Sequence, residues 1–237
     1  MDTVLLVLEY LGVIAFAVSG SMVAIDKEAD YVGVLLLSLV TCFGGGIMRD
    51  IFLGQTPPRF FTQYQSEIII SLVTSVIVIV FATIFKRAFV HYEHSIEAIN
   101  NIVDAIGLGA FTVGGSFIAL ECGFTSAHIV ISMGLISSIG GGLMRDLILR
   151  DIPFIIRKRV YALASFLGAS LYYILAVALN VDNLMASIAG VFMTFSLRIM
   201  ATVFKWNIPK AIDFDKLDAE ISAKNDESDV PCNKEKR

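Results

Sequence analysis

The chain has 237 residues, of which 56% are apolar types and only 17% are charged. A soluble domain carries about 25% charged residues, so this composition excludes an ordinary soluble protein and indicates a lipid environment. The net charge of -4, with no basic patch, argues against a nucleic-acid partner.

Seven apolar segments follow one another along the chain, each close to the roughly 20 residues that a membrane-spanning helix requires. Short polar connections separate them. In chain order the segments are Val4–Ile25, Tyr31–Leu53, Ile68–Phe85, Ile96–Leu120, Ala127–Leu149, Val160–Leu179 and Leu184–Phe204. The predicted fold class is therefore an all-α integral membrane protein with seven transmembrane helices.

The ends and connections predict how the chain sits in the membrane. Residues 1–206 are expected to form the transmembrane domain, and residues 207–237, which carry both charge signs, a largely disordered cytoplasmic tail. Lys27, the pair at 86–87 and the basic residues within 150–159 fall in alternate connections. The positive-inside rule then predicts a multi-pass protein of the cell (inner) membrane, with its N-terminus outside and its C-terminus cytoplasmic.

The chain contains an internal repeat. Residues 43–53 and 139–149 both read Gly-Gly-Gly-x-Met-Arg-Asp after their first residue, and residues 10–21 share a glycine-rich phrase with 105–116. The repeats are predicted to cover residues 4–86 and 96–180, followed by a seventh helix over 184–206. Three spans per repeat would place the second copy upside down, as in many transporters and channels. The duplication could instead serve only to build a stable bundle.

The two glycine triplets, Gly44–Gly46 and Gly140–Gly142, lie within the second and fifth spans. Each Gly costs a helix up to about 1 kcal/mol relative to Ala, so the second and fifth helices are predicted to break there. Freed carbonyl groups would suit a cation path, which makes the triplets candidate pore or hinge residues. The alternative is close helix packing through small residues.

Six ionisable residues in the spans form a candidate charge and gating network: Glu9, Arg49, Asp50, Asp104, Arg145 and Asp146. Such residues are costly within a membrane unless paired or hydrated, so they indicate an interior functional site. The repeat matches Glu9 with Asp104, which could pair with the arginines or carry coupling protons. Arg198, in the seventh span, could point inward or reach the membrane surface.

Hydroxyl side chains precede both glycine triplets. Ser38, Thr41, Ser137 and Ser138 are candidates to line a cation path. Hydroxyl groups within helices are also often satisfied by their own backbone.

The glycine and Arg-Asp motif also looks like the opening of the tRNA nucleotidyltransferases. Those enzymes need an Asp-x-Asp pair soon afterwards, and residues 54–61 contain none. The chain is therefore predicted not to be an enzyme, and no cofactor or metal site is expected.

The doubled Gly-Gly-Gly-x-x-Arg-Asp block, the glycine-rich first and fourth spans, and the closing Arg198-Ile-Met-Ala and Trp206-Asn-Ile-Pro sequences resemble the bacterial trimeric intracellular cation (TRIC) channels, also labelled glycine transporters. The resemblance implies a homotrimer in membrane lipid, with a potassium-permeable, weakly selective pore in each protomer lined by kinked second and fifth helices. The leading hypothesis is a channel for potassium or sodium ions. The alternative is a secondary transporter of a small amino acid such as glycine.

Overall fold

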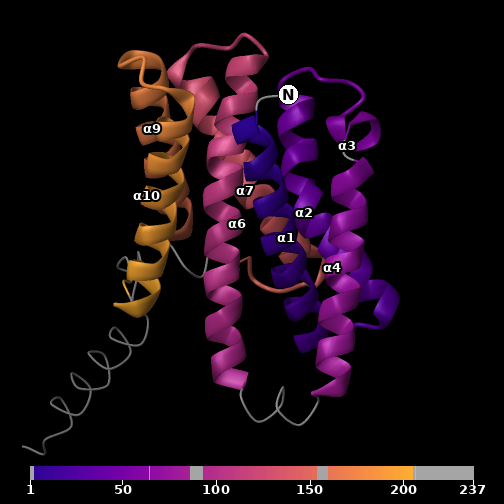
Figure 1. Cartoon of the computed structure of the whole chain (residues 1–237). Coiled ribbons are helices and arrows are strands. Elements are labelled where there is room, and N and C mark those ends of the chain that lie inside the picture. Colours follow the sequence, from indigo (N-terminus) through magenta and orange to yellow (C-terminus); the bar gives the residue numbers. More distant parts are fainter. Residues whose placement is uncertain (1–2, 64, 86–92, 154–159, 205, 207–237) are drawn as a thin grey trace, which may run out of the picture. The chain divides into compact units, whose positions relative to one another are not determined.

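The computed structural model describes residues 3–63, 65–85, 93–153, 160–204 and 206. Among these residues, seven helices are long and apolar enough to cross a membrane, as predicted (Figure 1). They are α1 (Thr3–Asp26), α2 (Tyr31–Phe52), α4 (Gln65–Ile84), α6 (Glu93–Glu121), α7 (Ala127–Ile148), α9 (Val160–Tyr173) and α10 (Asn183–Val203). A short helix, α3 (Arg59–Thr62), follows α2, and a π-helical turn, η1 (Ile174–Ala178), extends α9. The tail expected over 207–237 lies outside the described residues.

Local signals explain where several of these helices begin and end. The Asp30 side chain caps α2 by accepting a hydrogen bond of 2.7 Å from the Gly33 backbone N–H. Asp182 caps α10 in the same way through Leu184. Asn180 ends the preceding segment with a φ of 48°, a left-handed conformation that Asn tolerates well. The polar connections therefore do not only separate the spans but also terminate them.

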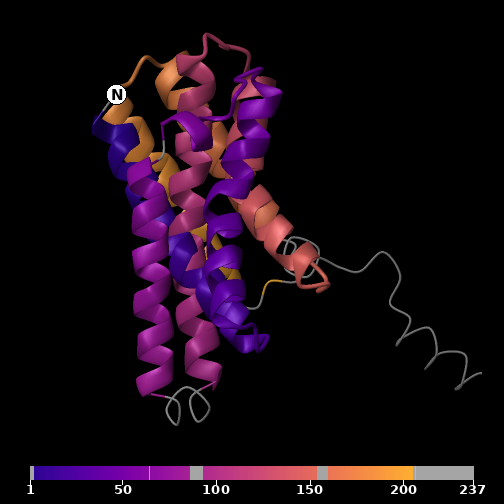
Figure 2. The same ribbon diagram turned by 90° about the vertical axis from the view of Figure 1, so that its right-hand side faces the viewer.

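The bundle is built around α1, α6, α2 and α7. Membrane-spanning helices that follow one another along the chain run in opposite directions (Figures 1 and 2). In α6, 78% of the membrane-spanning window is buried, against 17% in α4. The α6 helix is thus central and α4 peripheral. Phe16 of α1 and Phe111 of α6 meet at the centre, with ring centroids 5.1 Å apart.

The predicted break in the second and fifth helices is wrong. Both α2 and α7 continue as α-helix through their glycine triplets. Instead the glycines let the two helices touch, because a Cβ on Gly45 would collide with the Ser137 carbonyl, and one on Gly141 with the Thr41 carbonyl. A Cβ on Gly140 would lie only 2.8 Å from the Cα of Gly45. The structure therefore shows the packing alternative: absent side chains bring two backbones into contact. We call this contact the glycine crossing.

Positions matched by the sequence repeat make reciprocal contacts. A Cβ on Gly12 would lie 2.9 Å from the Phe111 ring, and one on Gly107 would collide with the Phe16 ring. At the glycine crossing, Met144 covers Gly44 just as Met48 covers Gly140. Each contact therefore has a counterpart in which the two matched positions are exchanged.

The glycine crossing predicts that Gly141→Ala destabilises the fold. The new methyl group must push the α2 backbone away, a type of overpacking that costs about 1–3 kcal/mol. Thermal unfolding of the purified protein in detergent should show a lower melting temperature. The matched control is Gly114→Ala on α6, where an added Cβ meets nothing within 4 Å. Equal melting temperatures for the two variants would contradict this account of the crossing.

Candidate functional site

Charged side chains gather in two places, one on each side of the glycine crossing. Arg49 and Asp50 lie in the last turn of α2, and Arg145 and Asp146 occupy the same place in α7. Because α2 and α7 run in opposite directions, the two Arg-Asp pairs lie toward opposite ends of the bundle. All four side chains are buried.

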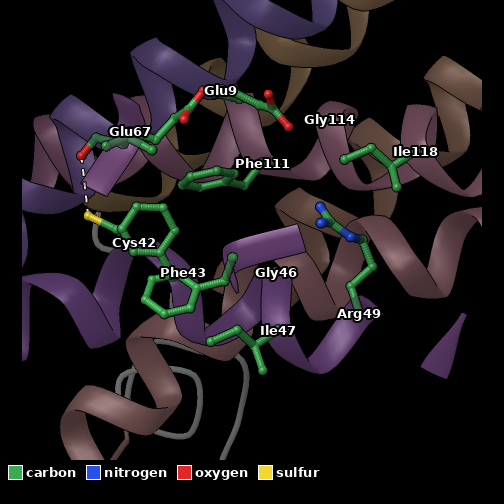
Figure 3. Close-up of a pocket in the computed structure, with 13 residues that line it drawn as sticks. Glu9, Cys42, Phe43, Gly46, Ile47, Arg49, Glu67, Phe111, Gly114 and Ile118 are labelled. Atoms are coloured by element: carbon green, nitrogen blue, oxygen red, sulfur yellow. Dashed lines mark hydrogen bonds between the residues drawn. The ribbon is translucent and has the colours of Figure 1, made fainter. Parts of the chain in front are cut away.

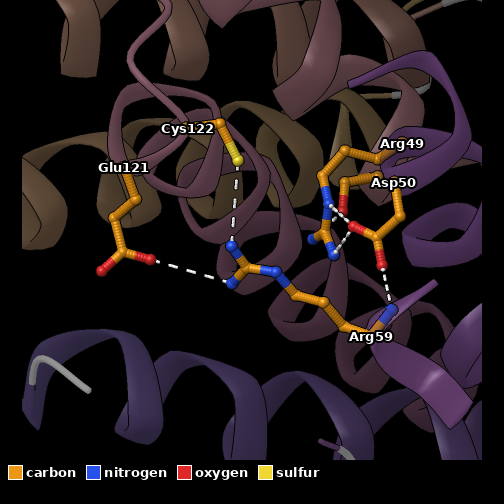
Figure 4. A network of polar contacts seen from close by, with 6 residues as sticks. Arg49, Asp50, Arg59, Glu121 and Cys122 are labelled. Carbon is orange, nitrogen blue, oxygen red and sulfur yellow. Dashed lines mark hydrogen bonds and ion pairs between the residues drawn. The ribbon is translucent and has the colours of Figure 1, made fainter. Parts of the chain in front are cut away.

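The first pair connects three parts of the chain (Figure 4). The Arg49 guanidinium donates two hydrogen bonds to Oδ1 of Asp50, through Nε at 2.9 Å and Nη2 at 2.7 Å. The other oxygen of Asp50 accepts the backbone N–H of Arg59 at the start of α3, also at 2.9 Å. Nη1 of Arg49 donates to the Ser137 hydroxyl on α7 at 3.2 Å. Arg49 therefore links α2 to α7 while its charge is neutralised by its neighbour in sequence.

The second pair repeats this arrangement. Arg145 donates to Oδ1 of Asp146 through Nε at 2.9 Å, with Nη2 at 2.8 Å from the same oxygen. Its Nη1 donates to the Ser19 hydroxyl of α1 at 3.3 Å, and Ser19 donates in turn to Asp104 at 3.5 Å. Both arginines thus pair with the next residue and reach one hydroxyl on another helix.

Arg198 of α10 joins the second pair. Its side chain is 1% exposed, and its guanidinium carbon lies 5.0 Å from the centre of the Tyr161 ring. The inward alternative for Arg198 is therefore correct, and the side chain does not reach the membrane surface. We call Asp104, Arg145, Asp146, Tyr161 and Arg198 the second charge cluster.

The first pair borders a small cavity between α1, α2, α4 and α6 (Figure 3). Two carboxylates line it, Glu9 of α1 and Glu67 of α4, which are 5% and 3% exposed. In Figure 3 they lie on one side of the cavity, and the Arg49 guanidinium points in from another. We call Glu9, Arg49, Asp50 and Glu67 the first charge cluster.

Glu67 is a site residue that sequence reasoning missed. It lies in the first turn of α4, three residues after Tyr64, where the chain still looked like a polar connection. Its neighbour in sequence, Ser66, donates to its Oε2 at 3.0 Å. Only the earlier start of the helix, at Gln65, turns this carboxylate into the bundle.

The four predicted hydroxyls are all buried between helices. Ser38 accepts a hydrogen bond of 2.6 Å from Ser75 of α4. Thr41 donates to the Leu37 carbonyl, one turn earlier in its own helix. Ser138 donates to the Gly134 carbonyl at 2.9 Å. Of the four, Ser137 alone bonds a charged side chain, because its hydroxyl accepts a hydrogen bond from the Arg49 guanidinium. Among the described residues, no group of three or more His, Cys, Asp or Glu side chains is placed to hold a metal ion.

The buried Arg49–Asp50 pair makes a prediction for stability. Asp50→Asn removes the charge that neutralises Arg49, and breaking a buried ion pair costs about 3–5 kcal/mol. Unfolding in detergent should show this loss. The matched control is Asp151→Asn, whose partner Lys27 is 3.0 Å away at the surface. A surface pair contributes about 0–1 kcal/mol, so similar losses in both variants would contradict a structural role for the buried pair.

Known membrane proteins resemble this chain in sequence. The model of the glycine transporter family matches two segments, residues 6–83 and 101–177, one within each predicted repeat. The UPF0126 membrane protein YvgT of Bacillus subtilis is 32% identical over 85% of this chain and 94% of its own length. The UPF0126 inner membrane protein YadS of Escherichia coli is 33% identical over 85% of this chain and 92% of its own length.

Two solved structures share the fold at similar identity. The TRIC trimeric intracellular cation channel orthologue from Rhodobacter sphaeroides superposes with a TM-score of 0.77 at 33% identity, covering 86% of this chain and 100% of that one. A prokaryotic TRIC channel crystallised in 0.5 M KCl also gives a TM-score of 0.77, at 30% identity, covering 88% of this chain and 100% of that one. By name, the matches are a glycine transporter family, membrane proteins and cation channels. This multi-pass membrane protein therefore belongs to the glycine transporter (UPF0126) family, and its fold is that of the prokaryotic TRIC channels.

Proposed function

We propose that the protein is a potassium-permeable channel for monovalent cations, with one conduction path in each protomer of a homotrimer. The observation that carries this proposal is the cavity of the first charge cluster, which extends to Gly46 at the edge of the glycine crossing. A path for ions needs polar groups within the membrane, and these are otherwise costly there. The likeness to solved TRIC cation channels at 30–33% identity supports the same function.

The path proposed here is closed at the glycine crossing. The α2 and α7 backbones touch at Gly45 and Gly141, which leaves no room for an ion between them. Conduction therefore requires the two helices to separate, with both triplets, Gly44–Gly46 and Gly140–Gly142, forming the constriction. Separation would expose the hydroxyls of Ser38, Thr41, Ser137 and Ser138 to the path.

Arg49 and Arg145 are the proposed gates. Arg49 holds Ser137 on α7, so this bond must break when α2 and α7 separate. Arg145 holds Ser19 on α1, and this bond breaks when α7 moves away from α1. Each arginine keeps its Asp partner, Asp50 or Asp146, on its own helix. The movement consequently leaves no bare charge in the membrane.

The proposal includes two features of topology. The reciprocal contacts at the centre, and the two segments matched by the family model, support inverted three-helix repeats. The ion pair between Lys27 and Asp151 joins the α1–α2 connection to the segment after α7. Since these connections carry the basic residues, we propose that this end faces the cytoplasm of the inner membrane and that the N-terminus lies outside.

A second candidate function, transport of glycine, is favoured by the name of the matched family. In that case Glu9 or Asp104 would couple substrate movement to protons or sodium. Broken helices would have offered the N-terminal ends of half-helices to the substrate carboxylate. Because α2 and α7 are continuous, this way of binding the substrate loses its support.

Flux from liposomes tests the two functions. We expect protein reconstituted in liposomes to pass potassium down its gradient without glycine, because a channel needs no coupled substrate. Labelled glycine uptake is measured in parallel on the same vesicles. Saturable glycine uptake with no potassium leak beyond that of empty liposomes would overturn the channel.

The gate predicts a gain of function. Ser137→Ala removes the hydroxyl that holds Arg49 across the glycine crossing, and a hydrogen bond to a charged group contributes about 1.5–3 kcal/mol. If that bond is lost on opening, the open population and the potassium flux should rise about tenfold or more. The matched control is Ser138→Ala, whose hydroxyl contacts Gly134 and Ser165 instead. Equal flux through both variants would contradict the role given to Arg49.

A further inference from the structure

The two charge clusters differ in net charge. In the second cluster, the charges of Asp104 and Asp146 are balanced by Arg145 and Arg198. In the first cluster, Arg49 is matched by Asp50, and Glu9 and Glu67 add two further carboxylates. The first charge cluster therefore has a formal excess of two negative charges.

One exchange between related positions and one added residue cause this difference. The contact between Cys42 and Ser71 recurs as the contact between Ser138 and Ser165, so α4 corresponds to α9. The position of Glu67, four residues before Ser71, is then occupied by Tyr161 in the second cluster. A neutral phenol replaces a carboxylate there, and the seventh helix adds the positive charge of Arg198.

The surroundings make this excess charge costly. The cavity walls include the side chains of Phe43, Phe60 and Phe111, together with Val13 and Ile118. Ionised carboxylates lose most of their hydration in such apolar surroundings, and the loss is offset by hydrogen bonds, such as the one from Ser66 to Glu67, by a positive charge or by protonation. The cavity of about 20 Å³ has room for one water-sized particle, which is the size of an unhydrated potassium ion and larger than an unhydrated sodium ion.

We infer that Glu9 and Glu67 bind one largely dehydrated monovalent cation, sodium or potassium, in the cavity of the first charge cluster. Carboxylate oxygens are the ligands that hard cations prefer. Sodium and potassium are the ions of the proposed path, so we assign the site to one of them. The inference deepens the proposed function, since it gives the path a resting site for its ion. Binding itself does not depend on conduction.

Thermal unfolding in detergent measures this binding without any flux. The full-length protein is unfolded in KCl, NaCl or N-methyl-D-glucamine chloride at constant ionic strength and pH. A bound ion stabilises the folded state, so the melting temperature should rise by about 3–5 °C for each tenfold increase in potassium or sodium above the Kd. The large organic cation does not fit the cavity and should have no such effect.

Variants assign the effect to the two carboxylates. Glu67→Gln and, separately, Glu9→Gln should each remove the response to potassium and sodium. Glu121→Gln is the matched control, because Glu121 pairs with Arg59 at 3.7 Å and does not line the cavity. Two separate glutamate variants are used so that the test can still be read if one of them does not fold.

Three outcomes would overturn the site. They are a wild-type melting temperature that is the same in all three salts, an undiminished response in both glutamate variants, and stabilisation by acid alone. The last would mean that Glu9 and Glu67 share a proton rather than a metal cation. If the melting temperature responds to potassium or sodium but no flux is seen in liposomes, the channel proposal is contradicted and the binding site is supported.

Discussion

The contact between the α2 and α7 backbones is the constraint on which the rest of the structure depends. With side chains at Gly45 and Gly141, the two helices would lie further apart, since each added Cβ meets the backbone of the other helix. The Arg49 guanidinium, 3.2 Å from Ser137, would then fall short of its partner. The two charge clusters lie on either side of this contact. Packing through small residues, a common device in membranes, therefore positions the polar chemistry of this protein.

The buried charges follow a simple rule of pairing. Arg49 and Arg145 are each neutralised by the next residue in sequence, and what each reaches on another helix is an uncharged hydroxyl. Separation of ions within a membrane costs several kcal/mol, whereas the loss of a hydroxyl contact costs much less. Because these two ion pairs are local, α2 and α7 can move relative to one another while both pairs stay intact. Each of these two arginine side chains thus makes an ion pair that stays intact during movement and a hydrogen bond to a hydroxyl that can break.

The spans, the Arg-Asp pairs and the matched phrases could be found from the sequence, because the length of an apolar segment and the charges within it are local signals. It was wrong about the helix break at Gly44–Gly46 and Gly140–Gly142. The cost of about 1 kcal/mol for each Gly applies in water, but an unwound helix within a membrane also leaves backbone groups unsatisfied, at several kcal/mol each. Glu67 was missed because it lies at the edge of an apolar run. The direction of Arg198 could not be predicted, since it depends on the rotation of α10 against Tyr161.

The seventh helix makes the two ends of the molecule electrically unequal. Arg198 has no counterpart among the residues of the first charge cluster, so the balanced cluster and the electronegative one lie on opposite sides of the glycine crossing. A cation that enters from the electronegative end meets an attractive well first, and one that enters from the other end meets it last. On the proposed path, current should therefore rectify: equal and opposite driving voltages would carry unequal currents. This polarity comes from Arg198 on α10 together with Tyr161 at the position that matches Glu67.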